Sequence, residues 1–167
     1  MALFPPGPGG GKEVEHGYKG KGSLLHLITD KEGKPLWITT TSAKGNERSQ
    51  ALVLLDQLKM IRIKDSRHMT ICEADKGYDS NELRGQILKR GYLPIIGYRK
   101  NRKDRVKTEE IYKCFGGSKK RWVVERSFSW LKRKCRRLLM RWERNPETWN
   151  AFALLGLIFM WLEILLG

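Results

Sequence analysis

Apolar and polar positions first separate the chain into a β-rich part and a helical part. Residues 23–29 and 36–42 are rich in β-branched and apolar side chains, and the run Asp30-Lys-Glu-Gly-Lys lies between them. Two such runs on either side of a short turn-forming segment predict an antiparallel β-hairpin. Asp30 is then most simply a turn residue.

A helix and a strand follow the hairpin. Asn46 can cap a helix that continues to about residue 59. Residues 69–74 form a short apolar run that predicts a strand ending at Asp75. The core positions of the helix include Leu52, Leu55 and Leu58.

After Asp75 the pattern changes back to helix and then to strand. Asp79-x-x-Glu82 has the form of a capping box and predicts the start of a helix that continues to about residue 90. Residues 93–96 predict one more strand, and residues 98–107 form a basic connector. Strands that alternate with helices predict an α/β fold class.

A long basic helix is predicted from about residue 119 to 141. One face of this helix is apolar and the rest of its surface is almost entirely Lys and Arg, so the helix should bury the apolar face and expose the cationic one. The apolar positions recur at alternating spacings of four and three, at Val124, Phe128, Leu131, Cys135 and Leu138.

Residues 151–166 are strongly apolar but include Glu163 and fall short of the roughly 20 residues that span a membrane. We therefore predict a buried core helix here and no membrane contact. The N-terminal segment has neither the basic nor the apolar region of a signal peptide. Its Gly and Pro content predicts a flexible segment over residues 1–22.

Composition narrows the class of partner. The 167 residues fit one domain, and a net charge of +15 indicates a polyanionic partner, most often nucleic acid. An RNA-binding protein would also fit the charge, but six tryptophans and the apolar C-terminal helix favour an enzyme-like core. Cys72, Cys114 and Cys135 lack metal-ligand spacing, so we predict reduced, buried thiols in a cytoplasmic protein.

The candidate chemistry lies on the basic helix. Arg121, Glu125 and Lys132 fall within an arc of about 60° and can serve one surface. A carboxylate that binds Mg²⁺, flanked by cations that bind phosphates, suits phosphoryl transfer on DNA. Alternatively, Glu125 only pairs with Arg121 one turn away, a contact worth about 0.2–0.5 kcal/mol.

These residues resemble the DDE insertion-sequence transposases of the IS-four and IS-five type. Their helix signature is Tyr-x2-Arg-x3-Glu-x6-Lys, which Arg121, Glu125 and Lys132 match in register, with Ser118 in place of the tyrosine. The run Ala74-Asp-Lys-Gly-Tyr-Asp resembles the second-Asp motif of the family. Further similarity covers nearly the whole chain, as in Gly17-Tyr-Lys-Gly-Lys-Gly, Ala43-Lys-Gly-Asn-Glu-Arg and Val124-Glu-Arg-Ser-Phe-Ser-Trp-Leu.

The resemblance implies an RNase H-like catalytic domain, a mixed sheet with flanking helices, over residues 23–167. It implies that Asp75 and Glu125 are catalytic and bind Mg²⁺ or Mn²⁺. It also implies partners: DNA, both transposon ends and target, and a homo-oligomer in the active complex of a bacterial, nucleoid-associated protein. The residues expected to bind DNA are Arg121, Lys132, Arg126, Arg133 and Arg136.

One expected acid is missing from this pattern. In similar transposases the first Asp ends the first strand, and Met1-Ala2 occupy that place here. Asp30, Asp56 and Asp65 sit in a turn, a helix and a loop, where a surface role is the simpler interpretation. We therefore expect a catalytic domain that is incomplete at its N-terminus, lacks the first central strand and exposes unpaired sheet edges.

Two interpretations of function remain open. The chain is a transposase fragment, inactive alone, that works with an upstream-frame product or a full-length transposase. The alternative is a DNA-binding regulator of transposition that does not cut DNA. The same basic surface serves both, so whether the chain alone is an enzyme stays uncertain.

Overall fold

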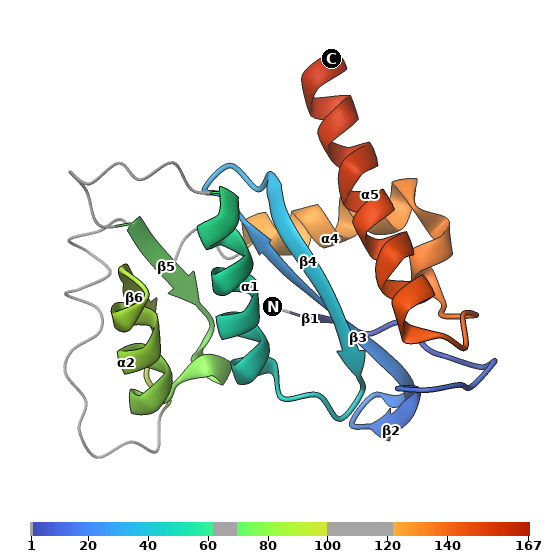
Figure 1. The fold of residues 1–167 in the computed structure, drawn as a ribbon, viewed down its shortest axis with the longest axis horizontal. Coiled ribbons are helices and arrows are strands. Elements are labelled where there is room, and N and C mark those ends of the chain that lie inside the picture. Colours follow the sequence, from blue (N-terminus) through green and yellow to red (C-terminus); the bar gives the residue numbers. More distant parts are fainter. Residues whose placement is uncertain (1, 62–69, 100–121) are drawn as a thin grey trace.

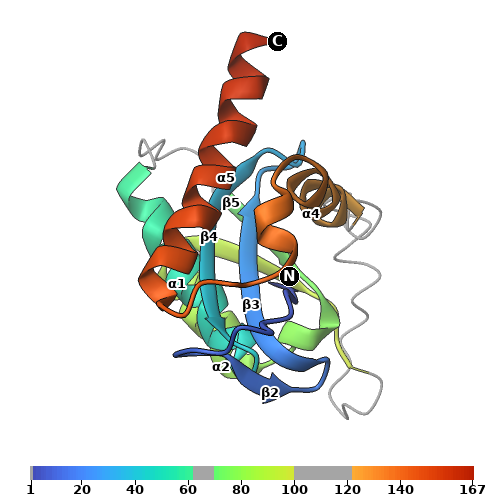
Figure 2. The same ribbon diagram turned by 90° about the vertical axis from the view of Figure 1, so that its right-hand side faces the viewer.

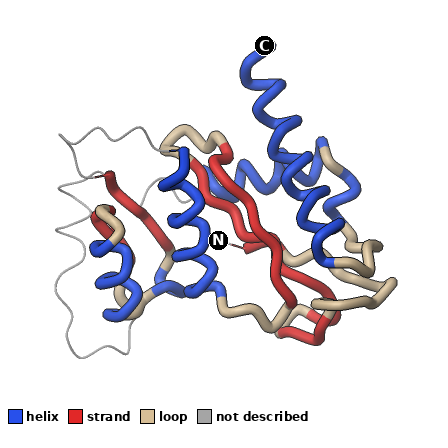
Figure 3. Tube along the Cα trace, viewed as in Figure 1, coloured by secondary structure: helices blue, strands red, loops and turns tan. Residues whose placement is uncertain are grey.

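Two separate β-sheets, with helices between and beside them, form the part of the chain that the structure describes (Figure 1). This computed structural model describes residues 2–61, 70–99 and 122–167. Along the described residues strands come first, helices and strands then alternate, and helices follow; Figure 3 colours the two types of element. The mixed α/β arrangement confirms the predicted fold class.

The larger sheet is built on a long antiparallel hairpin. Strand β3 (Gly20–Thr29) pairs with β4 (Pro35–Ser42), which confirms the predicted hairpin. On its other edge β3 pairs with the short strands β1 (Ala2–Leu3) and β2 (Glu15–Gly17). The hairpin therefore forms the frame on which the N-terminal residues assemble.

Asp30 closes the hairpin turn. Its Oδ1 accepts hydrogen bonds from the backbone N of Glu32 at 2.9 Å and of Lys34 at 2.8 Å. Such a carboxylate replaces the backbone acceptors that a turn lacks. The interpretation of Asp30 as a turn residue is confirmed.

The smaller sheet is parallel. Strand β5 (Thr70–Ala74) pairs with β6 (Tyr92–Ile96), and the short helix η1 (Lys76–Tyr78) and α2 (Asn81–Lys89) connect them. Both predicted strands are confirmed. The predicted cap of the helix is wrong by one residue, because Ser80 Oγ accepts from the backbone N of Leu83. Asp79 is instead engaged by Arg84, 3.0 Å away.

Helix α1 (Glu47–Ile61) lies between the two sheets (Figure 1). Asn46 Oδ1 accepts from the backbone N of Arg48 at 3.0 Å, which confirms the predicted cap. One apolar cluster contains Leu55 of α1 and Ile87 of α2, with Ile28 of β3 and Cys72 of β5 packed at its margin. Side-chain packing therefore joins the two sheets. Within the described residues no strand of one sheet pairs with a strand of the other.

The predicted long basic helix is shorter than expected. Helix α4 (Trp122–Lys134) ends at Lys134, and a short helix η2 (Arg136–Leu139) follows. The backbone at Cys135 leaves the helical region, with φ −109° and ψ 70°. This turn brings Leu138 against Gly156, where an added Cβ would lie 2.9 Å from Leu138 Cδ1. The prediction of one helix to residue 141 is wrong because tight packing requires the break.

Helix α5 (Pro146–Leu166) crosses the larger sheet and projects beyond it (Figures 1 and 2). One face is buried against the hairpin, and Trp161 Nε1 donates to Pro35 O at 2.6 Å. The prediction of a core helix thus holds for one face of α5. The buried positions are Trp149, Ala153, Gly156 and Met160.

Helix α5 is long and apolar enough to cross a membrane by length and composition, and it is the one such helix among the described residues. The helix has 21 residues and is therefore longer than the apolar run 151–166, which is by itself too short to span a membrane. A single helix of this kind is weak evidence for a membrane span, and 22% of its most apolar window is buried.

The N-terminal segment contacts the C-terminal part of the chain. Arg141 is completely buried and donates from Nη2 to Lys12 O at 2.7 Å and from Nε to Glu143 O at 3.0 Å. Its backbone N donates to Pro6 O at 2.8 Å. Flexibility of residues 1–22 and a domain boundary at residue 22 stay predictions.

Two of the three cysteines lie in the described residues and both are free thiols. Cys72 and Cys135 are each partly buried. Burial raises the pKa of Cys72 to about 11, so its thiol stays protonated and unreactive at neutral pH. Neither forms a disulfide, in agreement with the prediction, but both are partly buried and not the fully buried thiols expected; Cys114 lies outside the described residues.

A buried histidine in β3 gives the fold a pH dependence. His26 is 1% exposed, its Nε2 lies 2.7 Å from Thr41 Oγ1, and desolvation lowers its pKa from 6.5 to about 4. The unfolded chain binds this proton more tightly, so the stabilisation is complete above about pH 6.5 and is lost towards pH 4. We expect a loss on the order of 3 kcal/mol, measured by urea unfolding at several pH values.

The matched variants isolate this group. His26→Gln should flatten the fall in unfolding free energy between pH 6.5 and 4, whereas exposed His16→Gln should retain it. An equally steep fall in His26→Gln would show that another group causes the pH dependence.

Candidate active site

Asp75 lies where a parallel strand ends and a tight turn begins. It follows β5, is exposed, and its Oδ1 accepts from the backbone N of Lys76 at 2.7 Å. The backbone O of Asp75 accepts from Tyr78 N at 2.9 Å, which closes the turn. The carboxyl ends of parallel strands are common positions for ligand-binding groups. The predicted strand, Asp, turn, helix order is confirmed.

Two arginines fix this turn, and reasoning from the sequence did not identify them. Arg48 Nε donates to Gly77 O at 3.1 Å. Arg99 donates from Nε to Lys76 O at 3.2 Å and from Nη2 to Gly77 O at 3.1 Å. Arg48 belongs to the Ala43-Lys-Gly-Asn-Glu-Arg run, which was a signal of similarity without a role. Both cations hold carbonyls next to Asp75.

The buried ring of Tyr78 anchors the same turn to the apolar core. Its hydroxyl donates to Glu47 Oε2 at 3.3 Å. Desolvation, followed by the charge of Glu47, raises the pKa of Tyr78 above its usual range, so the hydroxyl stays a donor. Tyr78 therefore links the turn after β5 to the start of α1.

Glu125 lies in the first turn of α4 with its side chain exposed. Its carboxylate makes no hydrogen bond or ion pair with the other described residues, and Ser129 Oγ donates to its backbone O at 2.9 Å. Arg121, its alternative ion-pair partner and a predicted DNA-binding residue, lies outside the described residues. The surface ion-pair interpretation is therefore untested.

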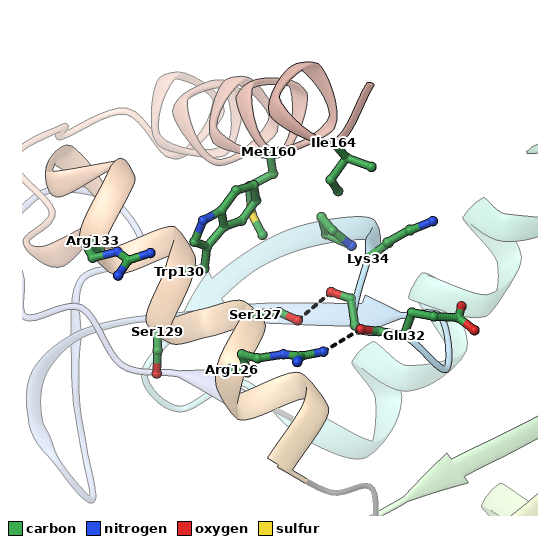
Figure 4. A pocket seen from close by; sticks show the side chains of 11 residues that line it. Glu32, Lys34, Arg126, Ser127, Ser129, Trp130, Arg133, Met160 and Ile164 are labelled. Carbon is green, nitrogen blue, oxygen red and sulfur yellow. Dashed lines mark hydrogen bonds between the residues drawn. The ribbon is translucent and has the colours of Figure 1, made fainter. Parts of the chain in front are cut away.

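Helix α4 is attached to the turn of the β3–β4 hairpin (Figure 4). The buried hydroxyl of Ser127 lies 2.6 Å from Gly33 O and 3.0 Å from Val123 O. Gly33 has φ 91°, and an added Cβ would lie 2.9 Å from Val123 Cγ1, so only glycine allows this approach. The attachment fixes which face of α4 is exposed.

Arg126 takes part in the same attachment. Its Nη2 donates to Glu32 O at 2.7 Å, and its guanidinium stacks 4.5 Å from the ring centre of Trp122. A hollow of about 430 Å³ lies beside it, between α4 and the end of α5, and Trp130 lines it (Figure 4). Arg126 is a predicted DNA-binding residue, but its guanidinium already has protein partners.

The other cations of this region divide into paired and unpaired ones. Lys134 lies 2.9 Å from Glu163 Oε1, and Arg137 Nε lies 2.8 Å from Glu143 Oε1. Three exposed cations have no carboxylate partner among the described residues. These are Lys132, Arg133 and Arg136, and all three were predicted to bind DNA.

Carboxylates of the type that Mg²⁺ and Mn²⁺ prefer are present, but on separate elements. Asp75 follows β5 and Glu125 lies on α4. The described residues contain no group of three His, Cys, Asp or Glu side chains that could hold a metal ion. Asp30 closes the hairpin turn, and Asp56 pairs with Arg90 at 2.8 Å, so neither supplies a further ligand. Asp65 lies outside the described residues.

Comparison with known proteins shows the family to which the chain belongs. A family model described as "Transposase DDE domain" matches residues 5–161. The chain belongs to the transposase DDE domain family. The match includes both carboxylates and all the candidate cations discussed above. Membership of this transposase family confirms the resemblance drawn from Arg121, Glu125, Lys132 and the Asp75 turn.

One curated relative resembles this transposase-family chain closely. It is a "Putative transposase for insertion sequence element IS402" from Burkholderia cepacia, 37% identical over 138 residues. The alignment covers 81% of this chain and 60% of the relative, so the chain spans less than two thirds of that protein. No solved structure matches the chain.

The attachment of α4 is testable through its buried hydroxyl. Ser127→Ala removes the donor to Gly33 O and should lower the unfolding free energy by about 1 to 3 kcal/mol, because it leaves a partly buried carbonyl unsatisfied. Urea unfolding measures this change. Exposed Ser129→Ala, which loses only a bond within α4, should change it by about 0.5 kcal/mol or less. Equal losses in both variants would contradict the role of Ser127.

Proposed function

We propose that this chain is the catalytic-domain part of a DNA transposase, whose reaction is metal-dependent strand cleavage and strand transfer in the transposition of an insertion sequence. Family membership over residues 5–161 supports the transposase class. The single observation that carries the proposal further is the exposed face of α4. It offers Glu125 without a partner among the described residues, next to Lys132 and Arg133.

In this proposal Asp75 and Glu125 hold the metal ion, as the resemblance implies. Bound Mg²⁺ or Mn²⁺ would supply an activated water or 3′-hydroxyl and stabilise charge at the phosphodiester. The turn after β5 orients Asp75 through the backbone N of Lys76. The Ser127 attachment keeps the Glu125 face of α4 turned away from the hairpin.

The unpaired cations bind the DNA backbone. Lys132 lies two turns beyond Glu125, roughly 10 Å along the helix, where a long side chain leaning towards the N-terminus can reach a flanking phosphate. Arg133 and Arg136 extend the same cationic surface. Neutralising phosphates releases counterions, which favours binding to any DNA sequence. Arg121 is proposed to approach from the other side of Glu125.

A second candidate is a DNA-binding regulator that does not cut. The resemblance implies three carboxylates, of which Asp75 and Glu125 are the second and third. The described residues bring no third acidic ligand to them, which favours binding without cleavage by this chain alone. Its partners would then be an upstream-frame product or a full-length transposase that carries the first Asp.

A cleavage assay separates the two candidates. The substrate is a duplex with the terminal repeat of the element that encodes the chain, incubated with Mg²⁺ or Mn²⁺. We expect cleavage only from a chain extended by its upstream coding sequence. In that extended chain, Asp75→Asn and Glu125→Gln should each reduce the rate by about 100-fold or more, because each removes a metal ligand.

Exposed Glu147→Gln, on α5, serves as the matched control and should cleave at the unchanged rate. Cleavage by the unextended chain would overturn the expectation that the first acid lies outside it. Full activity in Glu125→Gln would overturn the proposed site itself.

DNA affinity tests the cationic surface independently of cleavage. Lys132→Gln, Arg133→Gln and Arg136→Gln should each weaken binding to a random duplex and reduce the slope of log K against log salt by about 1. Fluorescence anisotropy at several salt concentrations measures this. Lys134→Gln removes the same charge from the same helix, but Glu163 already pairs with that lysine, so its slope should change less. Equal slopes in all four variants would contradict the assignment.

A further inference from the structure

The turn between β2 and β3 exposes an aromatic side chain and two cations at one end of the larger sheet. Tyr18 is fully exposed, and Lys19 beside it and Lys21 on β3 are exposed as well. The two strands pair up to Gly17 and Gly20, so the turn itself consists of Tyr18 and Lys19. The proposed catalytic site uses none of these residues.

Glycines on either side of the turn let its backbone lie close to the rest of the fold. An added Cβ on Gly17 would lie 2.5 Å from Ala43 O, and one on Gly22 would clash with Pro5 O. Larger residues are therefore excluded at both positions, and the side chains between them are left at the surface.

The N-terminal loop and the segment before α5 bring two further cations to the same end of the sheet. The backbone N of Lys12 donates to Arg144 O at 3.1 Å, and both side chains are exposed. In the same loop, an added Cβ on Gly10 would lie 3.8 Å from Lys21 Nζ. Three segments of the chain thus build one cationic surface. We call it the tip surface, and it consists of Lys12, Tyr18, Lys19, Lys21 and Arg144.

The tip surface keeps a positive charge. None of its four cations forms an ion pair or a side-chain hydrogen bond with another described residue. Of the nearby acids, Glu15 pairs with Lys44 at 3.8 Å, and Glu13 interacts electrostatically with buried Arg141. Uncompensated cations beside an exposed tyrosine fit an anionic partner, since phosphate oxygens accept hydrogen bonds from Lys, Arg and Tyr alike.

The tip surface and the exposed face of α4 lie at opposite ends of β3 (Figure 2). Strand β3 begins at Gly20, beside the tip, and ends at Thr29, just before the turn to which α4 is attached. Its 10 residues, at about 3.3 Å each, separate the two ends by about 30 Å. This length equals about nine base pairs of duplex DNA, close to one helical turn.

The spacing suits a single duplex bound at both surfaces. A duplex presents the same side to a protein again after each helical turn. We propose that the tip surface is a second DNA contact, which binds backbone phosphates about one helical turn away from the phosphodiester held at α4. This inference rests on the proposed function, because the α4 face defines where the duplex lies.

The position of the tip surface favours a duplex over a membrane. The projecting apolar end of α5 lies at the opposite end of the molecule from β2 (Figures 1 and 2). A membrane that received this apolar end would therefore not reach the lysines of the tip surface.

Binding to two lengths of random duplex tests the inference. A stem of about 6 base pairs, closed by a short linker so that it stays paired, spans about 20 Å and can occupy only one surface at a time. A duplex of about 24 base pairs reaches both. Fluorescence anisotropy at several salt concentrations measures both affinities.

On the long duplex, Lys19→Gln and Lys21→Gln should each weaken binding about fivefold at about 0.1 M salt. Each should also reduce the slope of log K against log salt by about 1, because one phosphate contact is lost. On the short stem the α4 face remains available, so binding should weaken about twofold or less. Equal losses on both lengths would overturn the bridging of two surfaces by one duplex.

Lys89→Gln on α2 is the matched control. It removes the same charge from an exposed lysine beside the smaller sheet and should bind both duplexes as the natural chain does. Circular dichroism checks that all variants fold, as expected for substitutions of exposed side chains.

Lys132→Gln separates this inference from the proposed function on which it rests. If Lys132→Gln weakens binding to the long duplex and the tip variants do not, the tip surface is no DNA contact and the proposed function stands. If only the tip variants weaken binding, the proposed α4 face is wrong, and the one-turn spacing is wrong with it. Tighter binding of an RNA duplex of the same sequence, lost in Lys19→Gln, would assign the tip surface to RNA and overturn the inference.

Discussion

The attachment of α4 to the β3–β4 turn fixes which face of this helix is exposed to the solvent. A buried serine hydroxyl reaches a carbonyl of the hairpin turn, and a glycine of positive φ lets the helix approach. The attachment buries the apolar stripe of α4 on the core and turns Glu125, Lys132 and Arg133 to the solvent. Phe128 and Leu131 of the same helix lie in the core, so apolar packing and the serine contact together fix how the acid and the cations face.

The turn after β5 fixes the position of Asp75 in a similar way. Two arginines hold the carbonyls of Lys76 and Gly77, and the buried Tyr78 ring anchors the turn to α1. Rigid support of this kind positions a ligand more accurately than a loop does. The two halves of the proposed site therefore sit on separately supported elements, and α1 packs between the sheets that carry them.

Local rules predicted much of this fold from the sequence. Asp30 and Asn46 act as expected, since turn and cap chemistry depends on a few neighbouring residues. Long-range contacts could not be read in the same way. Helix α4 ends at Lys134 because Leu138 must pack on Gly156, and Ser80 caps α2 because Arg84 engages Asp79. Candidate site residues came mainly from motif register. Arg48 and Ser127 lie in runs that resemble the family, but their contacts are tertiary, so no role for them could be read from the sequence.

The central claim is that Asp75 and Glu125 hold one metal ion. Titration of Mn²⁺, followed by electron paramagnetic resonance with the extended chain bound to duplex DNA, tests it most directly. We expect Asp75→Asn and Glu125→Gln each to weaken Mn²⁺ binding by at least about tenfold, because in the proposed site both carboxylates would bind the same ion. Unchanged Mn²⁺ affinity in either variant would contradict this claim.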